Sequence, residues 1–452
     1  MSKDTHPPSP EENKLARLYR LRSLLAFATP TILMVLFTSL YTIVDGIFVA
    51  RYVGTMALSA VSMFFPILSI EFGFAVMLHS GGSALIARKM GEGRTREARA
   101  RFTALVLLMG VSGVLITLAG LVYSDELVRA LGASAAQFDD CRTYTRMHFL
   151  FVPCLFLQCV FQSFFVVAGR PGLGLTVSLA AGILNMVLDY LFMVPMGMGV
   201  RGAALATGLG CVVPTVVGLW YFGCNRRQVL HFCLPGMPLR DFFRICSNGL
   251  SEMVTHLANF IVGYLFNISF MAWAGEDGVA AITIVFYFEF VFTAVFFGYS
   301  SGIAPIVSYK FGHGDKAQLH FIFRRSLFFL LISSLAAFGI SIGTLSFTLP
   351  IFVQTGSAVF ELVRAGFPLY AWALLLMGWS IFASAWFTAL SNGPVSALIS
   401  LGRAFVFLAG SVLLLPRLLG IDGLWLAPPA AELLGLGVTL FFFLRLRKRY
   451  GY

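Results

Sequence analysis

Long apolar runs separated by short polar stretches follow one another along the whole chain, and each run is about as long as a membrane-spanning helix. A helix needs about 20 mainly apolar residues to cross a bilayer. By this criterion the pattern predicts twelve transmembrane helices, at residues 24–50, 57–81, 103–123, 147–168, 173–195, 203–223, 247–273, 279–303, 325–347, 366–390, 395–416 and 423–444.

Composition assigns the chain to the same class. Hydrophobic residues make up 58% of its 452 residues and charged residues 12%, whereas a soluble domain has about 25% charged residues. The polar stretches between the apolar runs are too short to form an extramembrane domain. The polar N-terminal segment lacks the apolar core and cleavage site of a signal peptide. The sequence therefore predicts an all-α polytopic membrane protein with a short N-terminal tail.

The distribution of basic residues predicts the orientation. If the N-terminus is cytoplasmic, most of the 32 Lys and Arg residues fall in cytoplasmic segments, as the positive-inside rule requires. We therefore expect both termini in the cytoplasm. The net charge of +11 is then a topology signal and an attraction to anionic lipid headgroups, and it does not indicate nucleic-acid binding.

The second half of the chain repeats the first at a constant offset of 221 residues. ALSAVSMFFPI (57–67) aligns with GVAAITIVFYF (278–288), and ALIARKMGEG (84–93) aligns with PIVSYKFGHG (305–314). Each half holds an even number of predicted helices, so both halves enter the membrane from the same side. Such a parallel repeat suits alternating access around a site between the halves.

This repeat divides the chain into two six-helix lobes. The predicted parts are a cytoplasmic tail, an N-lobe, a cytoplasmic linker, a C-lobe and a second cytoplasmic tail, at residues 1–23, 24–223, 224–246, 247–444 and 445–452.

Three polar residues inside the N-lobe form the strongest candidate for chemistry. Asp45 interrupts the first apolar run, and Asn185 and Asp189 lie one turn apart on one face of the fifth predicted helix. Asp45 and Asp189 lie at a similar depth. Two carboxylates in one dry site cannot easily both be ionised, so the pair is suited to carry a proton, or to bind sodium if both stay charged. The alternative is that each Asp is only hydrogen-bonded inside the bundle.

Further residues in the apolar runs are candidates for supporting roles. Pro30 lies in the same helix as Asp45, and a mid-helix proline favours a bend there. Glu71, Glu252 and Glu289 are acids in or beside apolar runs, suited to attract a cationic substrate in a central cleft. The alternative for these acids is structural pairing with a neighbouring Ser, Tyr or His. Glu432, in the last predicted helix, is ambiguous.

Other patterns do not predict an enzyme. GYSSG (298–302) matches G-x-S-x-G but closes a membrane helix, whereas a nucleophile elbow needs a strand, a sharp turn and a helix. The seven cysteines have no metal-ligand spacing and are expected to be free. We expect no cofactor and no metal other than a coupling sodium ion.

Several motifs together resemble the multidrug and toxic compound extrusion (MATE) family, and the resemblance covers nearly the whole chain. They are P-x14-D in the first helix (Pro30 and Asp45), VDGIFVARYVG, SGGSALIARKMGEG, N-x3-D in the fifth helix, GLSEMVTHLANFIVGYLFN and GIAPIVSYKFGHGDK.

The resemblance implies a two-lobe, V-shaped exporter in a bacterial plasma membrane, which expels small organic cations in exchange for H+ or Na+. Its prokaryotic branch implies a cation site in the N-lobe, at Asp45, Asn185, Asp189 and Thr207, with Tyr41 one turn before Asp45. Another branch uses an acid in the tenth helix, but residues 366–390 contain no Asp or Glu here. We expect a monomer in the lipid bilayer, with no nucleic-acid partner.

Two other functions remain open from the sequence. A lipid-linked oligosaccharide flippase of the same superfamily would share the fold, but it should show a cationic cleft for a pyrophosphate headgroup. A membrane-embedded enzyme would need a nucleophile, a catalytic dyad or a metal set, and the sequence offers none of these.

Overall fold

The computed structural model describes residues 14–53, 63–134, 137–226 and 228–452. These residues form helices and connecting segments with no strand among them. Eleven helical spans in the described residues are long and apolar enough to cross a membrane, and one of them, Gly393–Leu419, is interrupted by a short π-helical segment. The helices are α1 (Leu21–Phe48), α3 (Phe65–Gly91), α4 (Thr95–Val122), the short α5 (Ser124–Ala130), α6 (Phe138–Val167), α7 (Pro171–Met193), α8 (Gly199–Cys224), α9 (Leu239–His313), α10 (Lys316–Phe352), α11 (Ala358–Ala389), α12 (Gly393–Leu401), α13 (Leu408–Leu419) and α14 (Ile421–Tyr450). Short helical turns accompany them at η1 (Lys14–Ala16), η2 (Val49–Val53) and η3 (Gly402–Phe407).

Helix α9 contains two of the predicted crossings. Gly275 interrupts it with φ 63° and ψ −151°, a conformation that glycine adopts without a steric penalty. Because the chain reverses there, α9 crosses twice, and the described helices are consistent with the twelve predicted crossings. The observed helices differ from the predicted ones mainly in length. Helix α4 begins at Thr95 and α6 at Phe138, several residues before their predicted starts. Polar residues at a helix end continue the helix beyond the apolar run, so hydrophobicity alone underestimates its length.

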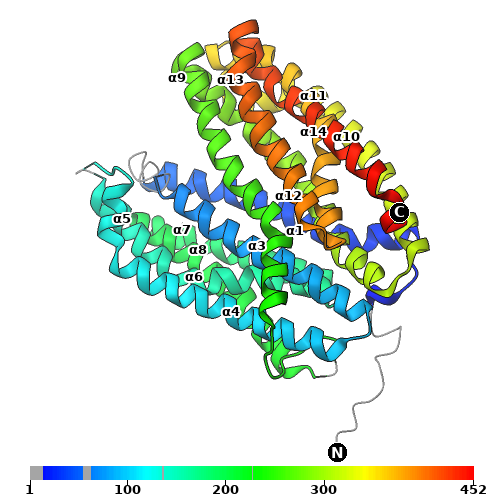
Figure 1. Ribbon diagram of the computed structural model, residues 1–452. Helices are drawn as coiled ribbons and strands as arrows, with labels where there is room; N and C mark the ends of the chain where they lie inside the picture. Colours follow the sequence, from blue (N-terminus) through cyan, green and yellow to red (C-terminus); the bar gives the residue numbers. More distant parts are fainter. Residues whose placement is uncertain (1–13, 54–62, 135–136, 227) are drawn as a thin grey trace, which may run out of the picture.

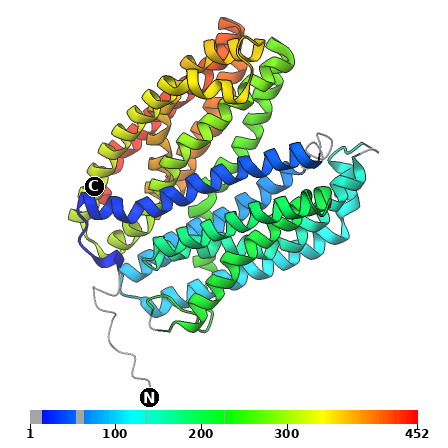
Figure 2. The same ribbon diagram turned by 180° about the vertical axis from the view of Figure 1, so that it is seen from behind.

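The helices form two lobes that meet at one end and diverge toward the other, as Figures 1 and 2 show. In the first lobe α1, α4, α6, α7 and α8 pack on one another, and in the second α10, α11, α13 and α14 do so. Helices α1 and α3 of the first lobe contact α9 of the second. The described ends of the chain lie near the junction, so the V opens at the opposite end.

The buried apolar clusters follow this shape. One large cluster joins the lobes at the junction, because it contains Phe102 and Phe164 of the first lobe together with Trp386 and Phe387 of the second. A separate cluster around Trp425 contains residues of the second lobe alone. The lobes are therefore held together at the closed end, and each has its own core toward the open end.

Two close backbone contacts confirm the internal repeat in space. A Cβ atom added at Gly91 of α3 would lie 2.0 Å from the carbonyl oxygen of Tyr309 in α9. At the position 221 residues later, a Cβ atom added at Gly312 would lie 2.1 Å from the carbonyl oxygen of Arg88. Only glycine permits such approaches, as in other tightly packed membrane helices. Each contact is thus the symmetry-related copy of the other, and the pair marks the axis between the lobes.

Candidate cation site in the first lobe

Helices α1 and α7 pack closely, and this contact brings Asp45 next to Asp189. Gly182 of α7 permits this close approach of the two helices, because a Cβ atom there would lie 2.4 Å from the Phe37 ring and 3.1 Å from the Tyr41 ring. The two helices run in the same direction, so positions further along both helices continue to face each other. Asp45 lies one turn beyond Tyr41, and Asp189 lies two turns beyond Gly182.

The carboxyl groups of Asp45 and Asp189 lie close enough to each other to interact electrostatically. Asp189 is fully buried, and Asp45 is half-buried. Neither oxygen of Asp189, nor Oδ1 of Asp45, has a hydrogen-bond donor within the described chain. Two ionised carboxylates at this distance would repel each other, so the geometry calls for a shared proton or a bound cation.

Asn185 adds an amide to the same face of α7, one turn before Asp189. It is buried, and its side-chain oxygen and nitrogen have no partner among the described residues. Gly210 of α8 packs against it, since a Cβ atom at Gly210 would lie 3.3 Å from the Asn185 Cβ. Buried polar groups are normally satisfied. Oxygen atoms from Asp45, Asn185 and Asp189 are ligands that hard cations prefer, so these residues fit a proton or a sodium ion.

Thr207 and Tyr41 differ in how they relate to this group. Tyr41 packs beside Gly182 and lies close enough to Asp45 to interact electrostatically. Thr207 lies on α8 one turn from Gly210, but the residue is exposed. Its place in the ligand set stays a prediction.

Glu71 is buried inside the first lobe and does not face a cleft. Its Oε2 atom lies 2.7 Å from Nε2 of His148 on α6, and 5% of the residue is exposed. This placement corrects the expectation that Glu71 attracts substrate, and it favours the alternative of pairing with a neighbouring histidine. Sequence analysis also missed Tyr144, which lies close enough to Asp45, Glu71 and Asp189 to interact electrostatically. No motif contains Tyr144, and only the packing of α6 brings it there.

The second lobe contains three carboxylates around one arginine. Nη1 of Arg403 lies 2.6 Å from Oε1 of Glu432, and Arg403 is also close enough to Glu252 and Glu289 to interact electrostatically. The hydroxyl of Tyr370 donates a hydrogen bond to Glu289. Arg403 lies inside the lobe in η3, within the predicted helix at residues 395–416. A lone arginine in an apolar run was the signal for this position.

The described residues contain no group of three or more His, Cys, Asp or Glu side chains arranged to hold a metal ion. All seven cysteines are free in the structure.

These features define a polytopic membrane transporter with two lobes and a carboxylate pair inside the first. The chain belongs to the MATE family: the MatE family profile matches residues 30–191 and 253–412. Members of this family are transporters, so the protein is a transporter and not an enzyme.

Known proteins similar to this chain agree with that assignment. The multidrug export protein MepA of Staphylococcus aureus strain RF122 is 22% identical over 430 residues, which cover 94% of this chain and 93% of MepA. MepA of Staphylococcus saprophyticus is 23% identical, and that match spans 66% of each chain, a little under two thirds. A structure described as the outward-facing conformation of a multidrug resistance MATE family transporter superposes with a TM-score of 0.90 at 22% identity, covering 97% of this chain and 98% of the other.

Proposed function

We propose that this protein is a multidrug exporter that exchanges small organic cations for H+ or Na+ by alternating access between its lobes. The observation that carries the proposal is the proximity of the carboxyl groups of Asp45 and Asp189 inside the first lobe. A buried acid pair without donors can take up a proton or a cation and release it when its surroundings change. The names of the staphylococcal relatives support export of drugs.

The coupling cation would bind between Asp45 and Asp189, with Asn185 as a further ligand. Coupling requires that the cation and the substrate stabilise different arrangements of the lobes. Helix α1 is suited to connect the two, because it carries Asp45 at one end and packs on the second lobe near the other. A Cβ atom at Gly298 of α9 would lie 2.5 Å from Cα of Ile32, two residues after Pro30.

The substrate would be cationic because the charges inside the second lobe are mainly acidic. Glu252 and Glu289 are half-buried there, and Arg403 is already paired with Glu432. A lipid-linked pyrophosphate would require cationic groups free to bind it. This arrangement therefore favours organic cations over the substrate of a flippase.

The orientation follows from the basic residues at the closed end. With both termini in the cytoplasm of a bacterial cell, the V opens toward the outside of the plasma membrane, and the structure corresponds to an outward-open arrangement. The shared fold with an outward-facing MATE transporter supports this orientation.

A transport assay in proteoliposomes tests the function. Ethidium is added, a proton or a sodium gradient is imposed, and the wild type is compared with Asp45→Asn and with Asp422→Asn, a control that neutralises an exposed acid. We expect one gradient to drive ethidium movement in the wild type and the control, and Asp45→Asn to abolish movement while ethidium still binds. If no gradient moves any organic cation tested, the proposed function is wrong.

A further inference from the structure

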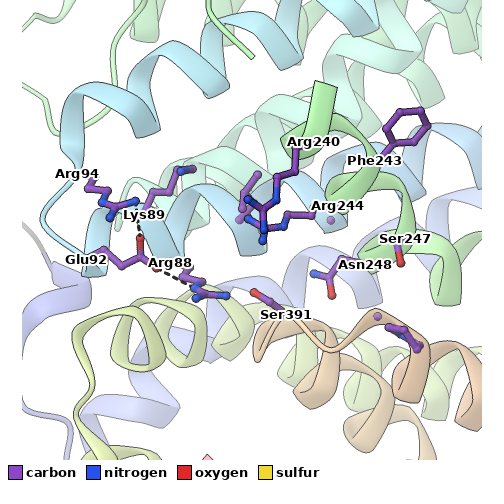
Figure 3. Close-up of a pocket in the computed structure, with 14 residues that line it drawn as sticks. Arg88, Lys89, Glu92, Arg94, Arg240, Phe243, Arg244, Ser247, Asn248 and Ser391 are labelled. Carbon is purple, nitrogen blue, oxygen red and sulfur yellow. Dashed lines mark hydrogen bonds and ion pairs between the residues drawn. The ribbon is translucent and has the colours of Figure 1, made fainter. Parts of the chain in front are cut away.

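A basic cavity lies between the two lobes at their closed end. It has a volume of about 740 Å³ and is formed by the last turns of α3, the first turns of α9 and the segment before α12. Five basic side chains and one acidic side chain line it, from Arg88, Lys89, Arg94, Arg240, Arg244 and Glu92. Figure 3 shows Arg240 and Arg244 extending from α9 toward α3, and Arg88 extending from α3 toward Ser391.

The neighbouring acids neutralise only part of this charge on the α3 side. The Glu92 carboxylate is shared by Arg88, at 2.9 Å, and Arg94, at 3.7 Å. Lys89 is buried, and its Nζ lies 2.8 Å from Glu97.

On the α9 side the basic residues are less compensated. Asp241 binds Arg101 at 3.0 Å and lies 3.9 Å from Arg244. In the part of the chain that the structure describes, Arg240 has no ion pair. The cavity therefore keeps a positive charge. The positive-inside rule alone predicts basic residues distributed over the cytoplasmic loops, whereas these basic residues gather around one cavity.

Neutral hydrogen-bonding groups also line the cavity, from Ser391 and Asn248. The Ser391 hydroxyl is buried, and no partner for it is found among the described residues. Its backbone has φ 58°, a value uncommon for a residue other than glycine. The Asn248 amide donates to the carbonyl of Thr388, and its own oxygen has no partner in the described chain. Strained backbone and unpaired polar groups together are typical of binding sites.

The size and chemistry of the cavity fit a phosphate group. The volume lies within the range of about 300 to 1,000 Å³ typical of small-molecule sites. Guanidinium groups bind phosphate oxygens through paired hydrogen bonds, and a basic pocket between membrane helices is suited to anionic headgroups. Phe243 lines the same cavity and is 62% exposed, so an apolar surface lies beside the arginines.

We propose that this cavity binds a phosphate group, carried by an anionic lipid headgroup or by a soluble phosphate, and that the bound group holds the lobes together at this end. The walls come from both lobes, with Arg88 on α3 and Arg240, Arg244 and Ser391 in the second lobe. A ligand that contacts both walls stabilises the closed junction through its preferential affinity for that arrangement. The consequence for transport rests on the proposed alternating access, whereas the binding itself does not.

A binding experiment on the full-length protein in detergent tests the site. Thermal unfolding is followed while phosphatidylglycerol, phosphatidylcholine, inorganic phosphate or pyrophosphate is added. The test variant is Arg240→Gln with Arg244→Gln, and the matched control is Arg96→Gln with Arg324→Gln, which removes two exposed arginines outside the cavity. Both test positions are exposed, so the variant should fold.

We expect an anionic ligand to raise the melting temperature of the wild type and the control, and its apparent dissociation constant to rise about tenfold or more in the test variant. A response to phosphatidylglycerol alone identifies a lipid headgroup, and a response to inorganic phosphate or pyrophosphate identifies a soluble phosphate. Equal responses of the test variant and the wild type, equal responses to phosphatidylglycerol and the zwitterionic phosphatidylcholine headgroup, whose choline cation offsets its phosphate, or no response at all would overturn the proposal.

A distance measurement tests the effect on the lobes. Spin labels are placed at Val122 and Leu418, which are exposed, one in each lobe, after Cys224 and Cys233 are replaced by serine. We expect the anionic ligand to increase the population with the longer distance, and the Arg240→Gln, Arg244→Gln variant to show no such increase. A distance distribution that the ligand leaves unchanged would overturn the clamping part of the proposal, even if transport of organic cations is confirmed.

Discussion

Nη1 of Arg403 lies 2.6 Å from Oε1 of Glu432 inside the second lobe, with side chains only 13% and 8% exposed. Arg403 also interacts with Glu252 and Glu289, so its charge is shared among three acids. A buried ion pair contributes little net stability compared with apolar side chains, but removing one partner leaves a buried charge uncompensated. Under the proposed function, Glu252 and Glu289 would remain to attract a cation.

Breaking this pair should destabilise the second lobe. We expect Glu432→Gln to lower the free energy of unfolding by about 2 kcal/mol, less than the usual 3 to 5 because two other acids remain near Arg403. The double variant Arg403→Gln, Glu432→Gln should recover part of the loss, which thermal unfolding in detergent measures. Arg364→Gln is the control, because its pair with Glu361 is exposed and should contribute almost nothing. Additive losses in the double variant would contradict this explanation.

The contacts of Gly91 and Gly312 make a second prediction. Alanine at either position would bring its Cβ to about 2 Å from a backbone oxygen of the other lobe, and a backbone cannot rotate away as a side chain can. We expect Gly91→Ala or Gly312→Ala to lower the free energy of unfolding by about 2 kcal/mol or more and to separate the lobes at the junction.

The matched control for these glycines is Gly339→Ala in α10. No atom lies within 4 Å of a Cβ atom built there, and alanine favours a helix, so unfolding should shift slightly upward or remain unchanged. Thermal unfolding and cross-linking across the junction report the two effects. Similar behaviour of Gly91→Ala and Gly339→Ala would show that the lobes tolerate a wider separation there.

The acids of the two lobes should respond differently to neutralisation. Glu71 is paired with His148 inside the first lobe, so Glu71→Gln should cost about 1 to 2 kcal/mol in stability and leave ethidium affinity unchanged. Glu252→Gln should weaken ethidium binding with a smaller effect on stability. Fluorescence titration and thermal unfolding of both variants separate these outcomes. Weaker ethidium binding in Glu71→Gln would restore Glu71 as a substrate residue.

The sequence predicted the helices and the repeat because both depend on local patterns. Runs of apolar residues determine the crossings, and the offset between Gly91 and Gly312 is visible in the alignment of the halves. The depth of Asp45 and Asp189 also follows from residue spacing along their helices. These inferences need only the order of residues and the rise of a helix.

Rotation of a helix about its axis is harder to infer in a membrane, because apolar side chains face both lipid and protein. This is why Glu71 was expected in the cleft and lies against His148. The basic cavity could not be predicted either, since it requires Arg88 and Arg240 to meet across two lobes. No sequence pattern links those positions.

Under the proposed coupling, Asp45 and Asp189 act as one unit. We expect Asp45→Asn and Asp189→Asn each to reduce gradient-driven ethidium movement by about 100-fold or more, and the double variant to be no worse than either, because groups that act together are non-additive. Initial rates in proteoliposomes provide the measurement, with Asp422→Asn as the control. Multiplied losses in the double variant would show that the two acids act separately.

Pro30 makes the final prediction, because it lies within the contact of α1 with α9, between Ala28 and Ile32, in the same helix as Asp45. Proline removes one backbone hydrogen bond and favours bending, and alanine would restore the bond. We expect Pro30→Ala to keep ethidium binding, since no proposed ligand changes, and to slow transport by about tenfold as α1 becomes stiffer. Pro350→Ala is the control, because Pro350 lies near the end of α10, away from the cation site, and should leave the rate unchanged. Equal rates for Pro30→Ala and the wild type would show that cation binding is transmitted between the lobes without bending of α1.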